Sequence, residues 1–146
     1  MPVWFSPDGG AEAAIVAAIN ANMGWFKALV FMYQSGPIHD ALVDYALTEQ
    51  GVSIIFDRRQ QFIAGPRIQE LIEAGAVCYF DKHEKSVRSQ YLFSEEGWYF
   101  TGSYLWTYTS EIRYAENLYF YNLIDDWQAY SDDWDFHQSH SELIVL

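Results

Sequence analysis

Short apolar segments alternate with segments of helical periodicity over residues 3–80. Strands are predicted where apolar residues run almost without interruption, at Val3–Phe5, Trp25–Tyr33, Val52–Phe56 and Val77–Phe80. Helices are predicted between them, at 11–23, at 37–50 and in a short segment around Ile68 and Leu71 that Gly75 closes. This order predicts an α/β fold with a mixed, mostly parallel central sheet flanked by helices.

The pattern changes from about residue 86. Residues 86–93 alternate, Glu95-Glu96-Gly97 predicts a hairpin turn, and further strands are expected at 98–101 and 118–121. A helix that contains Trp127, Tyr130 and Trp134 is expected to close the fold. Because no linker or repeat interrupts the chain, residues 1–146 are predicted to form one domain. The apolar tail 143–146 is expected to cover the core or to add a strand to a neighbouring chain.

Charge and composition exclude several classes of protein. The chain has 20 acidic and 8 basic residues and a formal net charge of −12. Because phosphate binding depends on Lys and Arg, a protein that coats free nucleic acid is not expected. The single cysteine, Cys78, excludes an internal disulfide, and its place in an apolar strand predicts an inert thiol. No membrane span or signal peptide is visible, so a cytoplasmic location is predicted.

Several short segments together resemble one known family. They are Phe5-Ser6-Pro7-Asp8-Gly9-Gly10, Tyr33-Gln34-Ser35-Gly36-Pro37-Ile38, Thr101-Gly102-Ser103-Tyr104-Leu105-Trp106-Thr107 and Ala115-Glu116-Asn117. This set resembles the phospholipase D superfamily, and specifically its branch of small endonucleases with a single HKD motif per chain. The resemblance implies a phospholipase D-like fold. It also implies a homodimer, because two chains must meet to complete one active site.

In that family each half-site carries H-x-K-x-x-x-x-D, then G-S-x-N, then a Glu before Asn. The His attacks phosphorus and forms a covalent intermediate, while the Lys, Asn and Ser side chains hold the phosphate oxygens. In a register without gaps, the positions of this motif are occupied here by Arg88, Gln90, Glu95, Ser103, Leu105 and Glu116. Only Ser103 and Glu116 match the family. A guanidinium stays protonated and cannot attack phosphorus, so Arg88 cannot replace the nucleophile.

The degenerate motif predicts a catalytically inactive protein that acts as a homodimeric or self-assembling binding protein, without a cofactor. One alternative is a phosphodiesterase or nuclease with an atypical active site, for which His83-Glu84-Lys85 offers a substitute H-x-K. A second alternative is an acidic inhibitor that mimics nucleic acid and binds a basic partner.

A basic cluster and an interface are also predicted near the degenerate motif. The basic cluster consists of Lys82, His83, Lys85 and Arg88. It is either an anion site or a solvated loop in which Arg88 pairs with Glu95, with Glu116 or with the same residues of a second chain in a dimer. Arg58 and Arg59 are expected at the rim of a dimer. The aromatic residues of this region either fill the space of the former active site as part of the core or face a partner. They are Trp98, Tyr99, Tyr104, Trp106 and Tyr108. The predicted interface residues are Arg88, Tyr104, Leu105 and Trp106.

A possible metal-binding pattern occurs close to the C-terminus. His137 and His140 are three residues apart, and Asp133 and Glu142 lie near them in the sequence. On one helical face, these side chains could hold a metal. Because such clusters near a C-terminus are more often surface residues, no metal is predicted.

Overall fold

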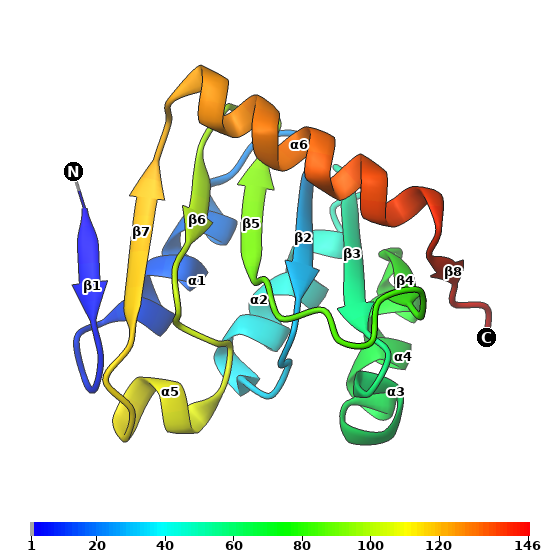
Figure 1. Cartoon of the computed structure of the whole chain (residues 1–146), viewed down its shortest axis with the longest axis horizontal. Coiled ribbons are helices and arrows are strands. Elements are labelled where there is room, and N and C mark those ends of the chain that lie inside the picture. The colour runs from blue at the N-terminus through cyan, green and yellow to red at the C-terminus, as the bar shows by residue number, and fades with distance from the viewer. Residues whose placement is uncertain (1) are drawn as a thin grey trace.

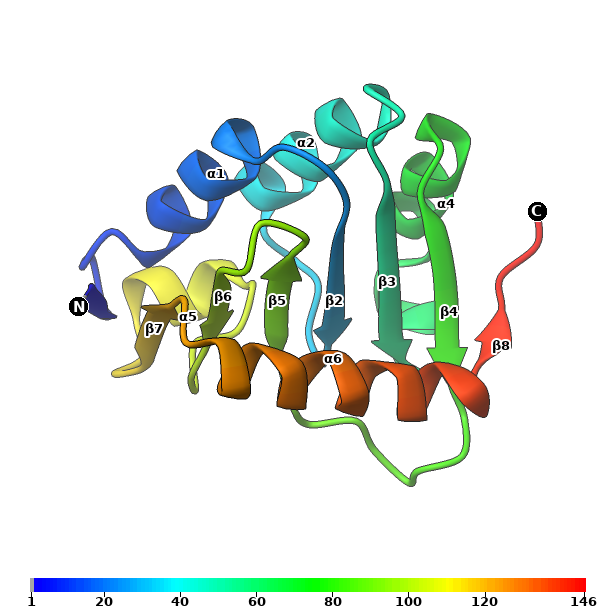
Figure 2. The ribbon, with the colours of Figure 1, turned by 90° about the horizontal axis from the view of Figure 1, so that it is seen from above.

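The computed structural model describes residues 2–146, which form one sheet in the order β1-β7-β6-β5-β2-β3-β4-β8 (Figure 1). The strands are β1 (Val3–Phe5), β2 (Phe26–Val30), β3 (Val52–Asp57), β4 (Val77–Asp81), β5 (Tyr91–Ser94), β6 (Tyr99–Thr101), β7 (Asn117–Tyr121) and β8 (Glu142–Leu143). The helices are α1 (Ala11–Ala21), α2 (Gly36–Ala46), α3 (Gln60–Ile63), α4 (Gly65–Ala74), α5 (Tyr108–Ile112) and α6 (Ile124–Ser139). Helices α1, α2 and α4 cover one face of the sheet, and α6 crosses the other face (Figure 2).

The mixed sheet and its flanking helices are confirmed, but the prediction that most strands are parallel is wrong. Within residues 2–146, only the pairs β2–β3 and β3–β4 are parallel, and the other five pairs are antiparallel. The crossover helices α2 and α4 make the central strands parallel. The turn at residues 95–97 instead joins β5 to β6 as a hairpin, which requires antiparallel pairing.

The central strands and the helix ends follow from local sequence. Ile54, Ile55 and Phe56 of β3 are fully buried, as an uninterrupted apolar run predicts for a strand covered on both faces. The Ser35 side chain caps α2 by accepting a hydrogen bond of 3.2 Å from the Ile38 N–H. Gly75 ends α4 with φ at +116°, a conformation that favours glycine.

Helix α6 is fixed to the sheet by two tryptophans. The indole N–H of Trp134, which is buried, donates a hydrogen bond of 2.9 Å to the Ala28 carbonyl of β2. The Trp127 indole donates one of 2.8 Å to the Ser94 carbonyl of β5. These anchors carry α6 across the sheet and place its last turn over the end of β4 (Figure 1).

The C-terminal segment forms the last strand of the sheet. Strand β8 pairs with β4, and the Ile144 N–H donates a hydrogen bond of 2.9 Å to the Cys78 carbonyl. The tail therefore adds a short strand to its own sheet, where Ile144 packs against the core, while Leu143, Val145 and Leu146 are exposed. Among the helices formed by residues 2–146, none combines the length and the apolar character that crossing a membrane requires.

Candidate functional site

Charged side chains and histidines lie at the end of the sheet where β3 and β4 end and β5 begins. A loop of residues 82–90 runs along this edge between β4 and β5 (Figure 2). Asp57, fully buried at the end of β3, fixes the loop by accepting a hydrogen bond of 2.8 Å from the Val87 N–H. Its second oxygen accepts hydrogen bonds of 3.2 and 2.9 Å from the backbone N–H and the Nε of Arg59.

Four cationic side chains surround a surface pocket of about 650 Å³ on this loop. This cationic pocket is lined by Arg58, Arg59, Lys85 and Arg88 together with Glu84 and Ser86. Arg58 donates a hydrogen bond of 3.0 Å to the Lys85 carbonyl, and Arg59 donates one of 2.6 Å to the Ser86 hydroxyl. The two arginines therefore hold the loop in place, while their own strand end is held by Asp57.

The structure brings together only part of the predicted basic cluster. Lys85 and Arg88 share the cationic pocket, whereas Lys82 forms an ion pair of 3.2 Å with Glu142. The His83 ring stacks on the His140 ring at a centroid distance of 4.5 Å. Arg58 and Arg59 also line this pocket, and their expected place at the rim of a dimer stays a prediction. Their position directly after the buried strand β3 is what places them at this edge.

Two positions of the family motif lie beside the cationic pocket. Arg88 is exposed, and within residues 2–146 its guanidinium has no hydrogen bond or ion pair. Arg88 also lines a second pocket of about 510 Å³, bounded by Gln90, Gly102 and residues of α6. Gln90 is buried and accepts hydrogen bonds of 3.2 and 3.1 Å from the N–H groups of Phe31 and Met32. The amide of Gln90 thus binds the end of β2 and is not free to bind a substrate.

The other motif positions are more dispersed. Ser103 and Glu116 line a shallow pocket of about 270 Å³ at the same edge of the sheet. Ser103 is engaged with Asn117, to whose amide oxygen its hydroxyl donates a hydrogen bond of 2.7 Å. Glu95 lies at the opposite end of β5 and accepts a hydrogen bond of 3.1 Å from the Trp25 N–H. The predicted pairing of Arg88 with Glu95 is therefore wrong within one chain, because the length of β5 separates them.

The predicted interface is also corrected in part. Tyr104 and Trp106 are each 2% exposed and pack in the core of their own chain, so neither ring can face a second chain. Their rings therefore take the first of the two predicted roles of the aromatic residues, which is to fill the core. Leu105 is half-buried and Arg88 is exposed, so the surface proposed for a dimer rests on these two.

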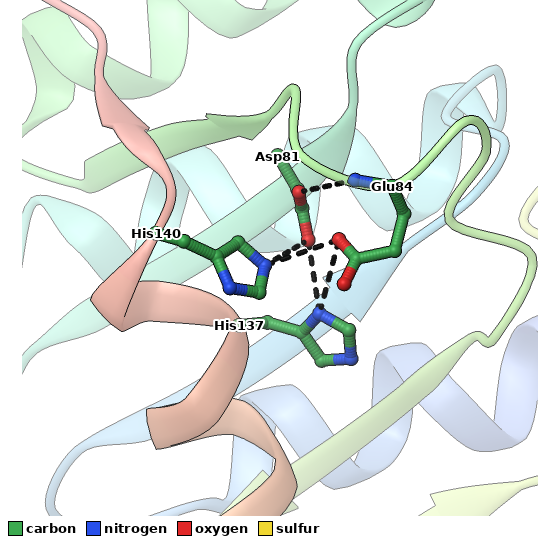
Figure 3. Close-up of side chains that lie close together, drawn as sticks. All are labelled: Asp81, Glu84, His137 and His140. Atoms are coloured by element: carbon green, nitrogen blue, oxygen red, sulfur yellow. Dashed lines mark hydrogen bonds and ion pairs between the residues drawn. The ribbon is translucent and has the colours of Figure 1, made fainter.

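Two carboxylates and two imidazoles meet at the end of β4 (Figure 3). This four-residue cluster consists of Asp81, Glu84, His137 and His140, whose facing atoms all lie within 4.8 Å of one another. The Asp81 Oδ2 lies 2.9 Å from the His137 Nδ1 and 3.0 Å from the His140 Nε2. The Glu84 Oε2 lies 3.1 Å from the His140 Nε2 and 3.7 Å from the His137 Nδ1. These are nitrogen and oxygen donors of the kind that bind transition metals.

The partners expected for these histidines from the sequence are different. Asp133 faces the other ring nitrogen of His137, with 3.5 Å between its Oδ1 and the His137 Nε2, and Glu142 pairs with Lys82. Burial acts to raise the pKa of Asp81, but its contacts with Glu84 and the hydrogen bonds that it accepts from the histidines and the His83 N–H outweigh burial, and the pKa is lowered. Burial acts to lower the pKa of His140, but the Asp81 and Glu84 carboxylates outweigh it, and that pKa is raised.

Comparisons of the whole chain with known proteins give structural matches only. No protein-family model and no curated protein sequence matches. The fold is similar to that of Nuc from Salmonella typhimurium, described as a phospholipase D family member, with a TM-score of 0.89, 18% identity, and coverage of 99% of this chain and 97% of that chain. NucT from Helicobacter pylori matches with a TM-score of 0.81, 11% identity and 98% coverage of both chains. The archaeal chromatin protein TrmBL2 matches with a TM-score of 0.67, 9% identity, and coverage of 99% of this chain and 54% of that chain.

These comparisons correct one prediction and confirm another. The prediction that the chain is not an enzyme is contradicted by the similarity to Nuc and NucT, two structures matched over almost their whole length that point to an enzyme. The prediction of fold is confirmed by the same two matches, together with the single mixed sheet and its flanking helices. The chain has the fold of the phospholipase D superfamily.

Proposed function

We propose that the protein is a phosphodiesterase with an atypical active site, in which the cationic pocket binds the phosphate of the substrate. The observation that carries this proposal is the concentration of Arg58, Arg59, Lys85 and Arg88 around one pocket of a chain whose net charge is −12. Surface charge of the opposite sign dominates elsewhere, so a local cationic pocket indicates a specific anionic ligand.

The cations of the pocket suit a phosphodiester group. Within residues 2–146, neither the Lys85 ammonium nor the Arg88 guanidinium is paired with a carboxylate, so both charges are available to a ligand. Guanidinium groups bind phosphate oxygens through two parallel hydrogen bonds, and Lys adds a point charge. As negative charge builds on the phosphate oxygens in the transition state, Arg88 and Lys85 would stabilise it.

His83 is the residue proposed to activate the nucleophile. Its imidazole is 66% exposed, and its Nδ1 lies 3.4 Å from the Glu84 Oε1, a carboxylate that can orient the ring. In the proposed reaction the His83 Nε2 takes a proton from water, whose oxygen attacks phosphorus. The phosphorus–oxygen ester bond breaks, and the proton passes from His83 to the departing alcohol. The other histidines within residues 2–146 are less exposed than His83, and His39 is buried against Tyr33 and Glu70.

The comparisons support a phosphate-containing substrate without naming it. Nuc is described as a member of the phospholipase D family, and the structure of TrmBL2 is described as showing a mode of DNA binding. Both descriptions concern molecules that contain phosphodiester groups. Because the identities are only 18% and 9%, the proposal rests on the pocket of this chain, and the comparisons add to it.

Hydrolysis of bis(p-nitrophenyl) phosphate by the purified full chain tests the proposal. We expect turnover by the wild-type protein and a loss of at least about tenfold in kcat/KM for Arg88→Gln and for His83→Gln. The matched control is Arg67→Gln, which removes the same charge from α4, outside the pocket, and should leave kcat/KM unchanged. Absence of turnover in the wild-type protein, or turnover that neither variant reduces, would contradict the proposal.

Two other functional predictions from the sequence remain predictions. One is the homodimer, for which Arg88 and Leu105 offer accessible surface. The other is the acidic inhibitor of a basic partner, for which Asp125, Asp126 and Asp132 of α6 are exposed as that function requires.

A further inference from the structure

We infer that Asp81, Glu84, His137 and His140 form a binding site for Zn²⁺. Two elements and one loop supply these residues. Asp81 is the last residue of β4, Glu84 follows in the loop, and the histidines lie in the last turn of α6 and at its cap. The spacing of three residues between His137 and His140 puts both rings on one face of the helix, above the end of β4 (Figure 3).

The separations within the cluster are those of ligands around one small ion. Ligands about 2.0–2.1 Å from a tetrahedral Zn²⁺ lie about 3.3–3.4 Å from one another. Here the carboxylate–imidazole separations are 2.9, 3.0, 3.1 and 3.7 Å. All four atoms lie within 4.8 Å of one another, so an ion at their centre would draw any wider pair closer together.

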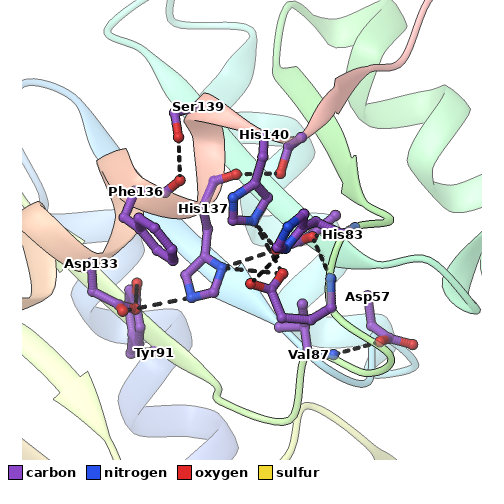
Figure 4. A network of polar contacts seen from close by, with 12 residues as sticks. Asp57, His83, Val87, Tyr91, Asp133, Phe136, His137, Ser139 and His140 are labelled. Atoms are coloured by element: carbon purple, nitrogen blue, oxygen red, sulfur yellow. Dashed lines mark hydrogen bonds and ion pairs between the residues drawn. The ribbon is translucent and has the colours of Figure 1, made fainter.

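The backbone and a neighbouring carboxylate orient the ligands toward that centre. The Asp81 Oδ1 accepts a hydrogen bond of 3.0 Å from the His83 N–H, which leaves the Oδ2 to face the histidines. Behind His137, the Asp133 Oδ1 faces the Nε2, and the Tyr91 hydroxyl donates a hydrogen bond of 2.7 Å to the Asp133 Oδ2 (Figure 4). A carboxylate behind a ligating histidine fixes the ring and raises its basicity, as in many zinc sites.

The donor set selects the kind of ion and its role. Two carboxylates would neutralise the charge of a divalent cation, and two imidazoles favour Zn²⁺ over Mg²⁺ or Ca²⁺, which prefer oxygen ligands. Four protein ligands complete a tetrahedral shell, which is typical of structural zinc. Bound zinc would therefore fasten the last turn of α6 to β4 and to the loop that carries the cationic pocket.

The zinc site and the proposed phosphodiesterase rest on different observations. Glu84 belongs to both, since it lines the cationic pocket and faces the histidines. Zinc would bind whether or not the pocket hydrolyses a substrate. The experiment below therefore measures metal binding alone and does not depend on turnover.

Calorimetric titration of the EDTA-stripped full chain with ZnCl₂ tests the site, with elemental analysis for the stoichiometry. We expect one Zn²⁺ per chain, a rise in melting temperature on addition of zinc, and intense visible absorption from tetrahedral Co²⁺ bound in its place. His140→Gln should weaken zinc binding at least about a hundredfold and abolish the rise in melting temperature. Glu84→Gln, at a half-buried loop position that a folded chain tolerates, should weaken it at least about tenfold.

The matched control is Glu73→Gln. Glu73 is an exposed carboxylate of α4 that lies outside the four-residue cluster, so this variant should bind zinc with the affinity of the wild type. Circular dichroism establishes that each variant is folded before its affinity is compared. If the stripped wild type takes up no zinc, or if His140→Gln and Glu84→Gln both bind it as the wild type does, the inference is overturned. Protonated histidines would then explain the cluster as a set of ion pairs.

Discussion

The carboxylate of Asp57 accepts a hydrogen bond of 2.8 Å from the backbone N–H of Val87 and thereby joins the end of β3 to the loop of the cationic pocket. Replacing Asp57 by Ala would leave this buried N–H without an acceptor. The half-exposed Arg59 would lose its partner as well, at little further cost. We expect Asp57→Ala to lower the free energy of unfolding in urea by about 2–3 kcal/mol.

Asp44→Ala is the matched control for this experiment. Asp44 lies on α2 and is exposed, so its loss should change the free energy of unfolding by less than about 0.5 kcal/mol. Equal effects of the two substitutions would show that Asp57 does not hold the loop.

A second prediction concerns Gln90, at the position where the resemblance to the family leads us to expect a lysine. Its amide accepts hydrogen bonds from the Phe31 and Met32 N–H groups and donates one of 3.3 Å to the Met32 carbonyl. A lysine there would leave both N–H groups without an acceptor and would bury an ammonium group. Gln90→Lys should therefore lower the free energy of unfolding by about 2–4 kcal/mol and should not increase hydrolysis of a phosphodiester.

Gln90→Glu separates the loss of the acceptor from the introduction of a charge, because glutamate adds a charge but keeps an acceptor for the two N–H groups. The carboxylate can still accept from the two N–H groups but loses the donor to the Met32 carbonyl, so its cost in urea unfolding should be smaller than that of lysine. A Gln90→Lys variant as stable as the wild type, or more active, would contradict the structural role of this amide.

The elements that the sequence predicted are those fixed by local patterns. Strands β2 and β3 were predictable because burial on both faces produces an uninterrupted apolar run. The pairing of β1 with β7 was not, since a strand at a sheet edge carries no local signal for its partner. The short helices α3 and α5 were also missed, because four or five residues are too few for a periodic pattern.

The sites were harder to predict than the elements, because their residues are brought together by long-range packing. The His137-x-x-His140 spacing was visible, but Asp81 is 56 residues from His137 in the chain. The two meet because Trp134 anchors α6 over the strand ends. The role of Gln90 follows from N–H groups at the end of β2 that no pattern near residue 90 reveals.

A third prediction concerns Gly102 of the Gly-Ser motif. Its φ is +140°, and a Cβ at this position would meet the backbone carbonyl of Asn117 on the neighbouring strand. Because the obstacle is backbone, the strand itself would have to move. Gly102→Ala should lower the free energy of unfolding by about 2–4 kcal/mol, from backbone strain and crowding together.

Gly97→Ala isolates the contribution of strain. Gly97 also has a positive φ, of 97°, but a Cβ there would meet nothing within 4 Å. Its substitution should cost only about 1–2 kcal/mol in the same urea experiment. If Gly102→Ala costs no more than Gly97→Ala, the close approach of Gly102 to β7 does not limit the residue at this position.

The last prediction concerns the thiol of Cys78 in β4, which is 1% exposed. Burial raises the pKa of this thiol to about 12, so at pH 8 almost all of it is in the neutral, unreactive form. The native protein should react with Ellman's reagent at least about a hundredfold more slowly than the chain unfolded in urea, whose thiol has an ordinary pKa of about 8.5.

Because β4 lies between β3 and β8, the thiol becomes accessible only when the sheet opens. Asp57→Ala should therefore accelerate the reaction by the same factor by which it raises the equilibrium constant for unfolding. Two results would show that β8 and the tail do not protect the edge of the sheet. One is rapid labelling of the native wild type, and the other is a labelling rate that does not change when Asp57→Ala lowers the stability.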